Sequence, residues 1–181
     1  NEAGSLQEFL RALLAQTLPP DEILISDGGS TDGTRELLQE AARQEPRVRP
    51  ILLPRSNRSV GRNAAIAAAR NEIIAVTDAG SRADPDWLER ITAPLRTDPT
   101  VCMVGGYYRA LARSPLQEAI AAATVVPPER VDPETFLPSS RSLAFRKDAW
   151  ARVGGYPEWS HHNEDTIFAL ALRQAGCRMV F

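Results

Sequence analysis

Short apolar runs alternate with amphipathic segments along the whole chain. Apolar residues recur every three or four positions over residues 5–18, which predicts a helix that ends at Pro19 and Pro20. The next apolar run, 22–26, is short and precedes a glycine-rich loop, as is typical of a buried strand that leads into a helix. This order recurs to the end of the chain. The predicted strands span 22–26, 48–54, 72–77, 101–111, 142–146 and 177–181, and the predicted helices span 5–18, 59–70, 84–95, 147–156 and 164–176, with two more through 37–41 and from 114 onward.

Strands that alternate with helices predict an α/β fold with a mainly parallel, Rossmann-like sheet and helices on both of its faces. The length of 181 residues suits one domain, so we expect a single domain over residues 1–181. A helix in such a fold usually connects two strands, and the helix at the start of the chain therefore predicts a first strand that the sequence lacks. Because the chain stops inside an apolar run, we also expect the fold to continue beyond Phe181.

Composition narrows the classes of partner. The formal net charge of -2 argues against binding along a nucleic-acid backbone. No apolar run approaches the roughly 20 residues that span a bilayer. Cys102 and Cys177 are far apart and have no metal-like spacing, so the sequence predicts neither a disulfide framework nor a zinc site, and a reducing cytoplasmic setting fits it best.

Two aspartates follow predicted strands. Asp27 precedes Gly28 and Gly29, and Asp78 precedes Ala79 and Gly80. Turn formation is the alternative explanation for each, since glycine and aspartate are common turn residues. The carboxyl ends of strands in an open α/β sheet gather ligand-binding groups, however, so the pair predicts one shared crevice. The first loop lacks the lysine of a P-loop and the pattern of a dinucleotide site.

Charged residues at two predicted helix starts are further candidates. Arg62 lies near the start of an alanine-rich helix, where a guanidinium and backbone amides can face an anion such as a diphosphate. The segment HHNED ends in Glu164 and Asp165. Here the alternative is a solvated helix start, capped by Asn163 and favoured by the helix dipole. The two histidines fit no H-E-x-x-H pattern, so we do not expect them to bind metal.

Three motifs in this order resemble those of the family 2 glycosyltransferases. EILISDGGSTDGT resembles the family's strand that ends in DDGSTDGT, SVGRNAAIAAARNEIIAVTDAG resembles its ARN helix and D-x-D strand, and SSRSLAFRKDAWARVGGYPEW with NEDTIFALALRQAG resembles its acceptor-side segment and ED helix. The resemblance covers nearly the whole chain. It implies the GT-A fold and transfer of a sugar from a nucleotide diphosphate donor to a hydroxyl group.

The resemblance also implies roles for individual residues. It makes Asp27 a contact of the nucleotide base, and it places Arg62 and Asn63 in the nucleotide pocket. Asp78 corresponds to the first aspartate of D-x-D, which faces the ribose and the metal-bound diphosphate. Asp165 corresponds to the catalytic base of an inverting displacement. The implied cation is Mg²⁺ or Mn²⁺, held at Asp78.

Two positions depart from the family pattern. Gly28 replaces the second aspartate of the first motif, and Gly80 replaces the metal-binding aspartate of D-x-D. Gly80 and the missing first strand keep open a non-catalytic GT-A-like module that binds a nucleotide or a partner. A sugar-phosphate nucleotidyltransferase that consumes a nucleoside triphosphate is a second alternative, because it would share the same type of sheet and metal site.

The resemblance implies that different parts of the chain bind the donor and the acceptor, and it implies a class of acceptor. We expect the nucleotide-binding part at about residues 1–106, the acceptor-side part at about 107–181, and a saccharide or lipid-linked acceptor. This interpretation fits a cytoplasmic location at the inner face of a membrane, with membrane association through segments outside this sequence. It also fits a homodimer that forms through the apolar C-terminal strand.

Overall fold

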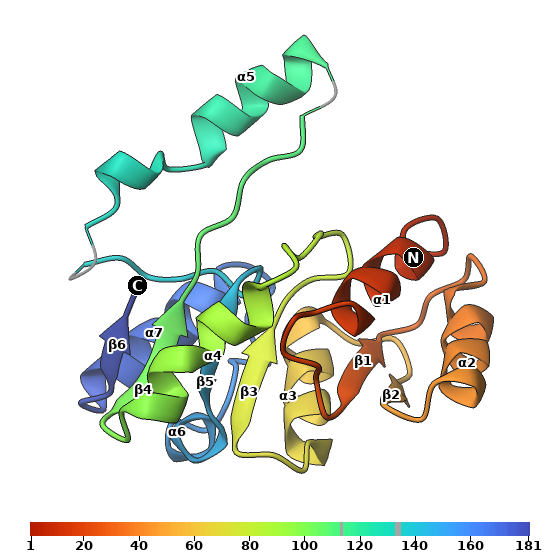
Figure 1. Cartoon of the computed structure of the whole chain (residues 1–181), viewed down its shortest axis with the longest axis horizontal. Coiled ribbons are helices and arrows are strands. Elements are labelled where there is room, and N and C mark those ends of the chain that lie inside the picture. Colours follow the sequence, from red (N-terminus) through yellow and green to blue (C-terminus); the bar gives the residue numbers. More distant parts are fainter. Residues whose placement is uncertain (113, 133–134) are drawn as a thin grey trace.

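The computed structural model describes residues 1–112, 114–132 and 135–181, and it has the alternation of strands and helices that the sequence predicts (Figure 1). The strands are β1 (Ile23–Asp27), β2 (Val48–Leu52), β3 (Ile73–Val76), β4 (Val101–Gly105), β5 (Leu143–Arg146) and β6 (Arg178–Val180). The helices are α1 (Leu6–Leu14), α2 (Thr34–Gln44), α3 (Arg58–Ala68), α4 (Trp87–Thr97), α5 (Pro115–Thr124), the 3₁₀ turn η1 (Pro128–Arg130), α6 (Lys147–Arg152) and α7 (Glu164–Gln174). No helix among the described residues is long and apolar enough to cross a bilayer.

Across the described residues, the strands form two sheets rather than one. β1 and β2 pair in parallel, and the other four strands form a sheet in the order β3-β5-β4-β6. β4 and β6 are parallel, whereas β5 is antiparallel to both of its neighbours, β3 and β4. The predicted α/β fold is therefore confirmed, with β5 reversed against strands that share one direction.

The reversal of β5 follows from where the chain returns to the sheet. The segment that leaves β4 at its carboxyl end comes back to that same end, where the Gly106 amide donates a hydrogen bond to the Ser142 carbonyl at 2.9 Å. A chain that re-enters at this end must run back along the sheet. The segment between Gly106 and Ser142 carries α5, which stands apart from both sheets in Figure 1. The sequence prediction for this segment extends over residues 133–134, which lie outside the described residues.

Alternate residues of the sheets pack on different helix layers. In β5, Leu143 and Phe145 belong to a core that includes α6 and α7, whereas Ala144 between them packs with Ile91 and Leu95 of α4. This alternation is what a strand with helices on both faces requires. A third core joins α1 and α2 to β1 and β2; its buried members are Leu6, Phe9, Leu10, Leu13, Ile23, Leu38 and Val48.

A cavity of about 860 Å³ runs between the two sheets. The edges of β1 and β3 line it along their length, and helices α1 and α4 contribute Phe9, Leu13 and Trp87. Most of the lining is apolar, but charged residues line both ends, and those at one end include Arg58, Arg62 and Asp78. That end lies at the carboxyl ends of β1 and β3, where the sequence predicts the crevice.

Several element boundaries differ from the prediction, and two of the differences have a clear cause. β4 ends at Gly105 instead of continuing to 111, because the chain leaves the sheet after Gly106. α4 begins at Trp87 rather than at residue 84. The Pro85 carbonyl accepts a hydrogen bond from the Thr17 amide at 2.9 Å, so this part of the chain binds the end of α1 instead of starting a helix.

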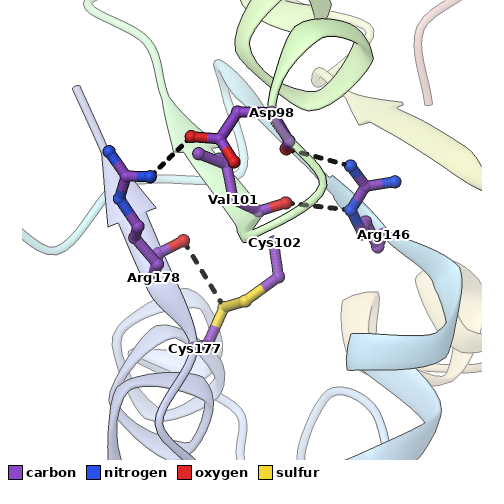
Figure 2. Close-up of a disulfide and its surroundings, with 6 residues drawn as sticks. All are labelled: Asp98, Val101, Cys102, Arg146, Cys177 and Arg178. Carbon is purple, nitrogen blue, oxygen red and sulfur yellow. Dashed lines mark hydrogen bonds and ion pairs between the residues drawn. A yellow bond between two sulfur atoms is a disulfide. The ribbon is translucent and has the colours of Figure 1, made fainter.

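Cys102 and Cys177 form a disulfide, which the sequence analysis did not predict (Figure 2). Their Cα atoms are 5.8 Å apart because β4 and β6 are neighbours in the sheet, although the two cysteines are 75 positions apart in sequence. The bond joins β4 to the turn between α7 and β6, and an ion pair links Arg178 of β6 to Asp98, which lies just before β4. Disulfides are rare in reducing compartments, so this bond does not support the expected reducing setting.

Candidate functional site

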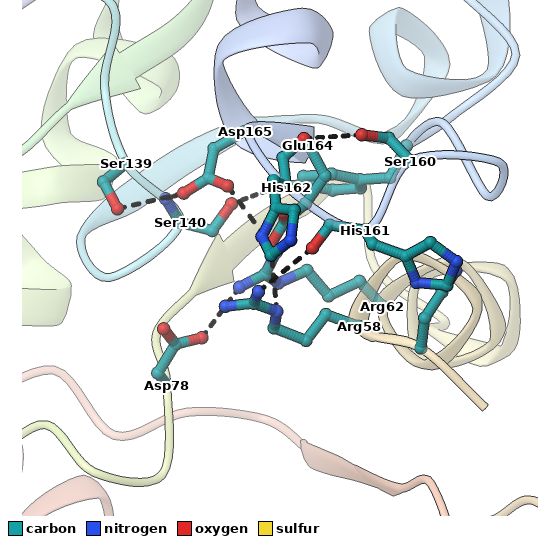
Figure 3. Close-up of polar contacts among 12 residues, drawn as sticks. Arg58, Arg62, Asp78, Ser139, Ser140, Ser160, His161, His162, Glu164 and Asp165 are labelled. Atoms are coloured by element: carbon teal, nitrogen blue, oxygen red, sulfur yellow. Dashed lines mark hydrogen bonds and ion pairs between the residues drawn. The ribbon is translucent and has the colours of Figure 1, made fainter. Parts of the chain in front are cut away.

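The guanidinium of Arg62 lies among three carboxylates (Figure 3). Its Nη2 contacts Asp78 Oδ1 at 2.9 Å, and its Nη1 contacts Glu164 Oε1 at 2.9 Å and Asp165 Oδ1 at 3.9 Å. Only 11% of the Arg62 side chain is exposed, and its charge lies 5.4 Å from the centre of the Tyr156 ring. A buried cation needs such partners, because burial disfavours its charged form. Arg62 therefore joins the end of β3 to the start of α7.

Asp165 is held by donors from the segment before β5. The Ser139 hydroxyl and the Ser140 amide donate hydrogen bonds to its Oδ2, at 3.0 and 2.9 Å. Burial favours a raised pKa for this carboxyl group, but the Ser140 and Ser139 hydrogen bonds and the Arg62 charge outweigh it and lower the pKa. Asp165 is therefore a carboxylate at neutral pH.

Asp78 directs its side chain to the site rather than to the turn. The turn after β3 is closed by a backbone hydrogen bond from the Ser81 amide to the Asp78 carbonyl, at 2.9 Å. The Asp78 carboxylate pairs with Arg62, and 40% of its side chain is exposed. Space is open around Gly80, where an added Cβ would meet no atom within 4 Å. The described residues contain no cluster of three metal-ligating side chains, and Asp78 is the carboxylate of this turn.

Asp27 lies apart from the Arg62 cluster. Its Oδ1 accepts hydrogen bonds from the Gly29 and Ser30 amides and from Arg35 Nε, at 2.9, 3.0 and 2.7 Å. Burial favours a raised pKa for this carboxyl group, but the hydrogen bonds from Ser30, Arg35 and Gly29 outweigh it and lower the pKa strongly. Gly28 lines the cavity at the end where Arg62 and Asp78 lie, whereas the Asp27 carboxylate secures the loop behind it.

Asn63 makes four hydrogen bonds within the chain. Its Oδ1 accepts from Trp150 Nε1 and the Tyr156 amide, and its Nδ2 donates to the Tyr156 carbonyl and to Glu158 Oε1, all at 2.9 to 3.0 Å. This amide therefore ties α3 to residues 156–158, which lead toward Asp165. Its hydrogen-bonding positions are occupied by these contacts.

Other residues of the site were not singled out from the sequence. Arg58 lies 3.4 Å from Glu164 and donates to the His161 carbonyl at 3.3 Å. Glu164 was considered only as a favourable residue for a helix start. Ser139 and Ser140 begin the motif that resembles the acceptor-side segment, but their contact with Asp165 was not predicted, because it depends on how the segment after β4 returns to the sheet. His161 and His162 belong to no metal-binding cluster of the described residues.

Comparisons with known proteins identify the family of the chain. Residues 1–135 match the family described as Glycosyl transferase family 2. The chain is 28% identical over 190 residues to the succinoglycan biosynthesis protein ExoA of Rhizobium meliloti. This alignment covers 99% of this chain and 57% of that protein. It is also 34% identical over 102 residues to an uncharacterized glycosyltransferase of Nostoc sp. That alignment covers 56% of this chain and 32% of that protein.

A solved structure has the same fold. The mannosyltransferase PcManGT from Pyrobaculum calidifontis, in complex with GDP-Man and Mn²⁺, superimposes with a TM-score of 0.76 at 24% sequence identity, over 99% of this chain and 51% of that one. At this identity the likeness establishes the GT-A fold. The chain spans at most about 57% of the length of the relatives described here.

Proposed function

Because the chain belongs to glycosyl transferase family 2, we propose that it transfers a sugar from a nucleotide diphosphate donor to an acceptor hydroxyl, with inversion of the anomeric carbon. The observation that carries the proposal is the Arg62 cluster, in which a strand-end aspartate and a partly buried aspartate contact the same guanidinium. Residues 1–106 form the donor side and residues 107–181 the acceptor side of one domain.

Asp165 is the base in this proposal. The acceptor oxygen forms a bond to the anomeric carbon as the bond from that carbon to the diphosphate oxygen breaks, and the hydroxyl proton passes to Asp165. Its lowered pKa supports this role, since the group must be a carboxylate before the reaction. The Ser139 and Ser140 hydrogen bonds hold Oδ2, which leaves Oδ1 on the Arg62 side of the carboxylate.

Asp78 and Arg62 face the donor diphosphate. Mg²⁺ commonly binds one or two protein carboxylates together with substrate phosphates and water, and a single exposed aspartate beside open space at Gly80 fits that mode. When bound, Mg²⁺ or Mn²⁺ would offset the charge of the leaving diphosphate. The Mn²⁺ and GDP-Man in the PcManGT structure support this choice of cation and donor class.

In this proposal Asp27 and Asn63 shape the nucleotide pocket indirectly, because their side chains are bonded within the chain and lie outside the cavity lining. We assign Asp27 to the base end, where it fixes the loop through Gly28 beside the cavity. Asn63 lies next to Arg62 on α3 and holds this helix against residues 156–158. The acceptor class is a saccharide or a lipid-linked saccharide, which the role of ExoA in succinoglycan biosynthesis supports.

Calorimetric titration tests the donor side. The protein is titrated with UDP, GDP and their sugar conjugates, with and without Mn²⁺, and the titrations are repeated with Asp78→Ala. We expect metal-dependent binding of one nucleotide, and at least about tenfold weaker binding by the variant. Asp148→Ala, which changes an exposed residue of α6, is the matched control and retains binding.

The alternatives predict other outcomes. Binding of a nucleotide sugar without its consumption, in the presence of saccharide acceptors, would favour a non-catalytic module, which the open space at Gly80 also permits. Consumption of a nucleoside triphosphate with a sugar phosphate would favour a nucleotidyltransferase. Binding that is unchanged in Asp78→Ala would remove Asp78 from the donor site.

A further inference from the structure

Glu164 is a buried carboxylate that the proposed reaction does not use directly. It is the first residue of α7 and is only 3% exposed. Its Oε1 contacts Arg62 Nη1 at 2.9 Å and Arg58 Nε at 3.4 Å, so two guanidinium groups from the first turns of α3 converge on it. Burying a carboxylate is costly unless partners compensate for its lost hydration, and these two cations provide that compensation.

The position of Glu164 determines where Arg62 can lie. Of the two terminal nitrogens of Arg62, Nη1 is held by Glu164 and Nη2 contacts Asp78. Asp165, the next residue in the chain, has its Oδ1 3.9 Å from the same Nη1. Glu164 and Asp165 therefore share one arginine, and the charge that Asp165 experiences from Arg62 depends on the carboxylate beside it.

We propose that Glu164 is a positioning residue, which holds the Arg62 guanidinium between Asp78 and Asp165 and offsets its positive charge at Asp165. The inference rests on the proposed function, in which Asp165 is the base. A base that faces an unbalanced cation is a weaker proton acceptor. In this arrangement the carboxylate of Glu164 keeps Asp165 basic, while the geometry of Arg62 stays fixed for the donor.

The other groups that face Asp165 are few and identifiable. Ser139 and Ser140 donate to it from the segment before β5. The Tyr156 hydroxyl bonds the Ser140 hydroxyl at 2.9 Å, and Asp78 lies across Arg62 at the end of β3. Replacing Glu164 with glutamine changes none of these groups, so any change in the titration of Asp165 reports the lost charge.

A favourable interaction with the helix dipole is the competing explanation for Glu164. Glu36 provides a matched control, because it lies in the first turn of α2, which has the same length as α7, and is exposed. Glu164→Gln and Glu36→Gln make the same chemical change at a helix start. Only Glu164→Gln removes charge from the Arg62 cluster.

The primary test measures the pKa of Asp165 in the free protein by NMR of ¹³C-labelled aspartate carboxyls, with the signal assigned from Asp165→Asn. We expect the pKa of Asp165 to fall by about one pH unit in Glu164→Gln and to stay unchanged in Glu36→Gln. A folded Glu164→Gln protein with an unchanged Asp165 titration would overturn the inference. If Glu164→Gln does not fold, Glu164→Asp takes its place, and a smaller fall in the same direction is expected because the shorter side chain draws the charge away from Arg62.

The second test measures the pH dependence of transfer. In Glu164→Gln the acidic limb of kcat moves to lower pH and the plateau falls about threefold to tenfold, with KM for the donor changed less than kcat. A wild-type profile in the variant would contradict the inference. If the wild-type protein transfers no sugar while the NMR titration shows the expected fall, the proposed function fails and the electrostatic coupling stands; the two failures are thereby distinguished.

Discussion

Asp165 offers the most direct test of the chemistry at the scale of single residues. An asparagine at this position can still accept the hydrogen bonds that Ser139 and Ser140 donate, so Asp165→Asn should fold. It cannot take a proton from the acceptor. We expect transfer to fall by at least about a hundredfold, with donor affinity within about threefold of wild type.

Initial rates with the donor identified by calorimetry test this prediction, and titration of the same variant reports its donor affinity. Asp148→Asn makes the same change at an exposed position of α6 and serves as the control. Wild-type turnover in Asp165→Asn would exclude Asp165 as the base, whereas loss of donor binding would assign it a role in the donor pocket.

Asp27 predicts a dependence of stability on pH. The folded-state pKa of this carboxyl group lies below its ordinary value of 3.8, so its contribution to stability is fully present above that value and is lost as the pH falls through the folded-state pKa. Asp27→Asn should therefore lower the free energy of unfolding by about 1 to 3 kcal/mol at pH 6. The difference between the two proteins should shrink by about 1 kcal/mol at pH 3.

Urea unfolding at pH 6 and pH 3 measures both quantities. The exposed Asp21 provides the control variant Asp21→Asn, since it lies just before β1 outside the loop that Asp27 secures. A stability difference between wild type and Asp27→Asn that stays constant with pH would show that the carboxylate is not held as the hydrogen bonds indicate.

How far the sequence predicts the site differs from residue to residue. Asp78, Arg62 and Asp165 could be proposed because each belongs to a motif or follows a predicted strand or helix start, and the structure brings them together. Glu164 has the same local pattern as any acidic residue at a helix start, and its burial arises only when the start of α7 meets Arg58 and Arg62 of α3. The pattern around Asp27 indicates a strand end, but whether the carboxylate faces the ligand or its own loop depends on where Arg35 lies.

At the scale of elements, the disulfide between Cys102 and Cys177 should stabilise the C-terminal part of the sheet. It closes a long loop and joins β4 to the turn before β6. We expect Cys177→Ser to lower the free energy of unfolding by about 2 to 4 kcal/mol. A reducing agent should lower the stability of the wild-type protein by a similar amount and leave the variant unchanged.

The free energy of unfolding, measured by denaturation with and without reductant, tests this prediction. Reactive thiols are also counted in protein that was unfolded without reductant. Two reactive thiols under that condition would mean that the bond does not form. Equal stability of the wild-type protein in both conditions would mean that β6 is held by strand pairing and by the Asp98–Arg178 ion pair alone.

The order of elements was predictable because it depends on local periodicity. The direction and pairing of the strands were less predictable, because they depend on where distant parts of the chain come back to the sheet. Every predicted strand has a counterpart, because short apolar runs between amphipathic segments have few other solutions. The direction of β5 was not predictable, since it follows from the end at which the segment after Gly106 returns. The disulfide was missed for a related reason, because the adjacency of β4 and β6 cannot be inferred from two cysteines that are distant in sequence.

At the scale of the whole molecule, the division into two sheets sets the expected pattern of local stability. β1 and β2 pair only with each other among the described strands, and the free edge of β1 lines the cavity. β4 and β5 have partners on both sides and lie between two helix layers. Helix α3 connects the two regions, since it packs on β1 while its Ile66 belongs to the core of the larger sheet.

Native-state hydrogen exchange should therefore detect two cooperative units. We expect the amides of β1 and β2 to exchange through an opening whose free energy is at least about 2 kcal/mol below that for β4 and β5. The reason is that opening the smaller sheet breaks one strand pairing and one helical core, whereas opening the larger sheet also disrupts the opposite helix layers. Equal protection of both sheets would mean that α3 and the contacts around Arg62 couple the two regions into one unit.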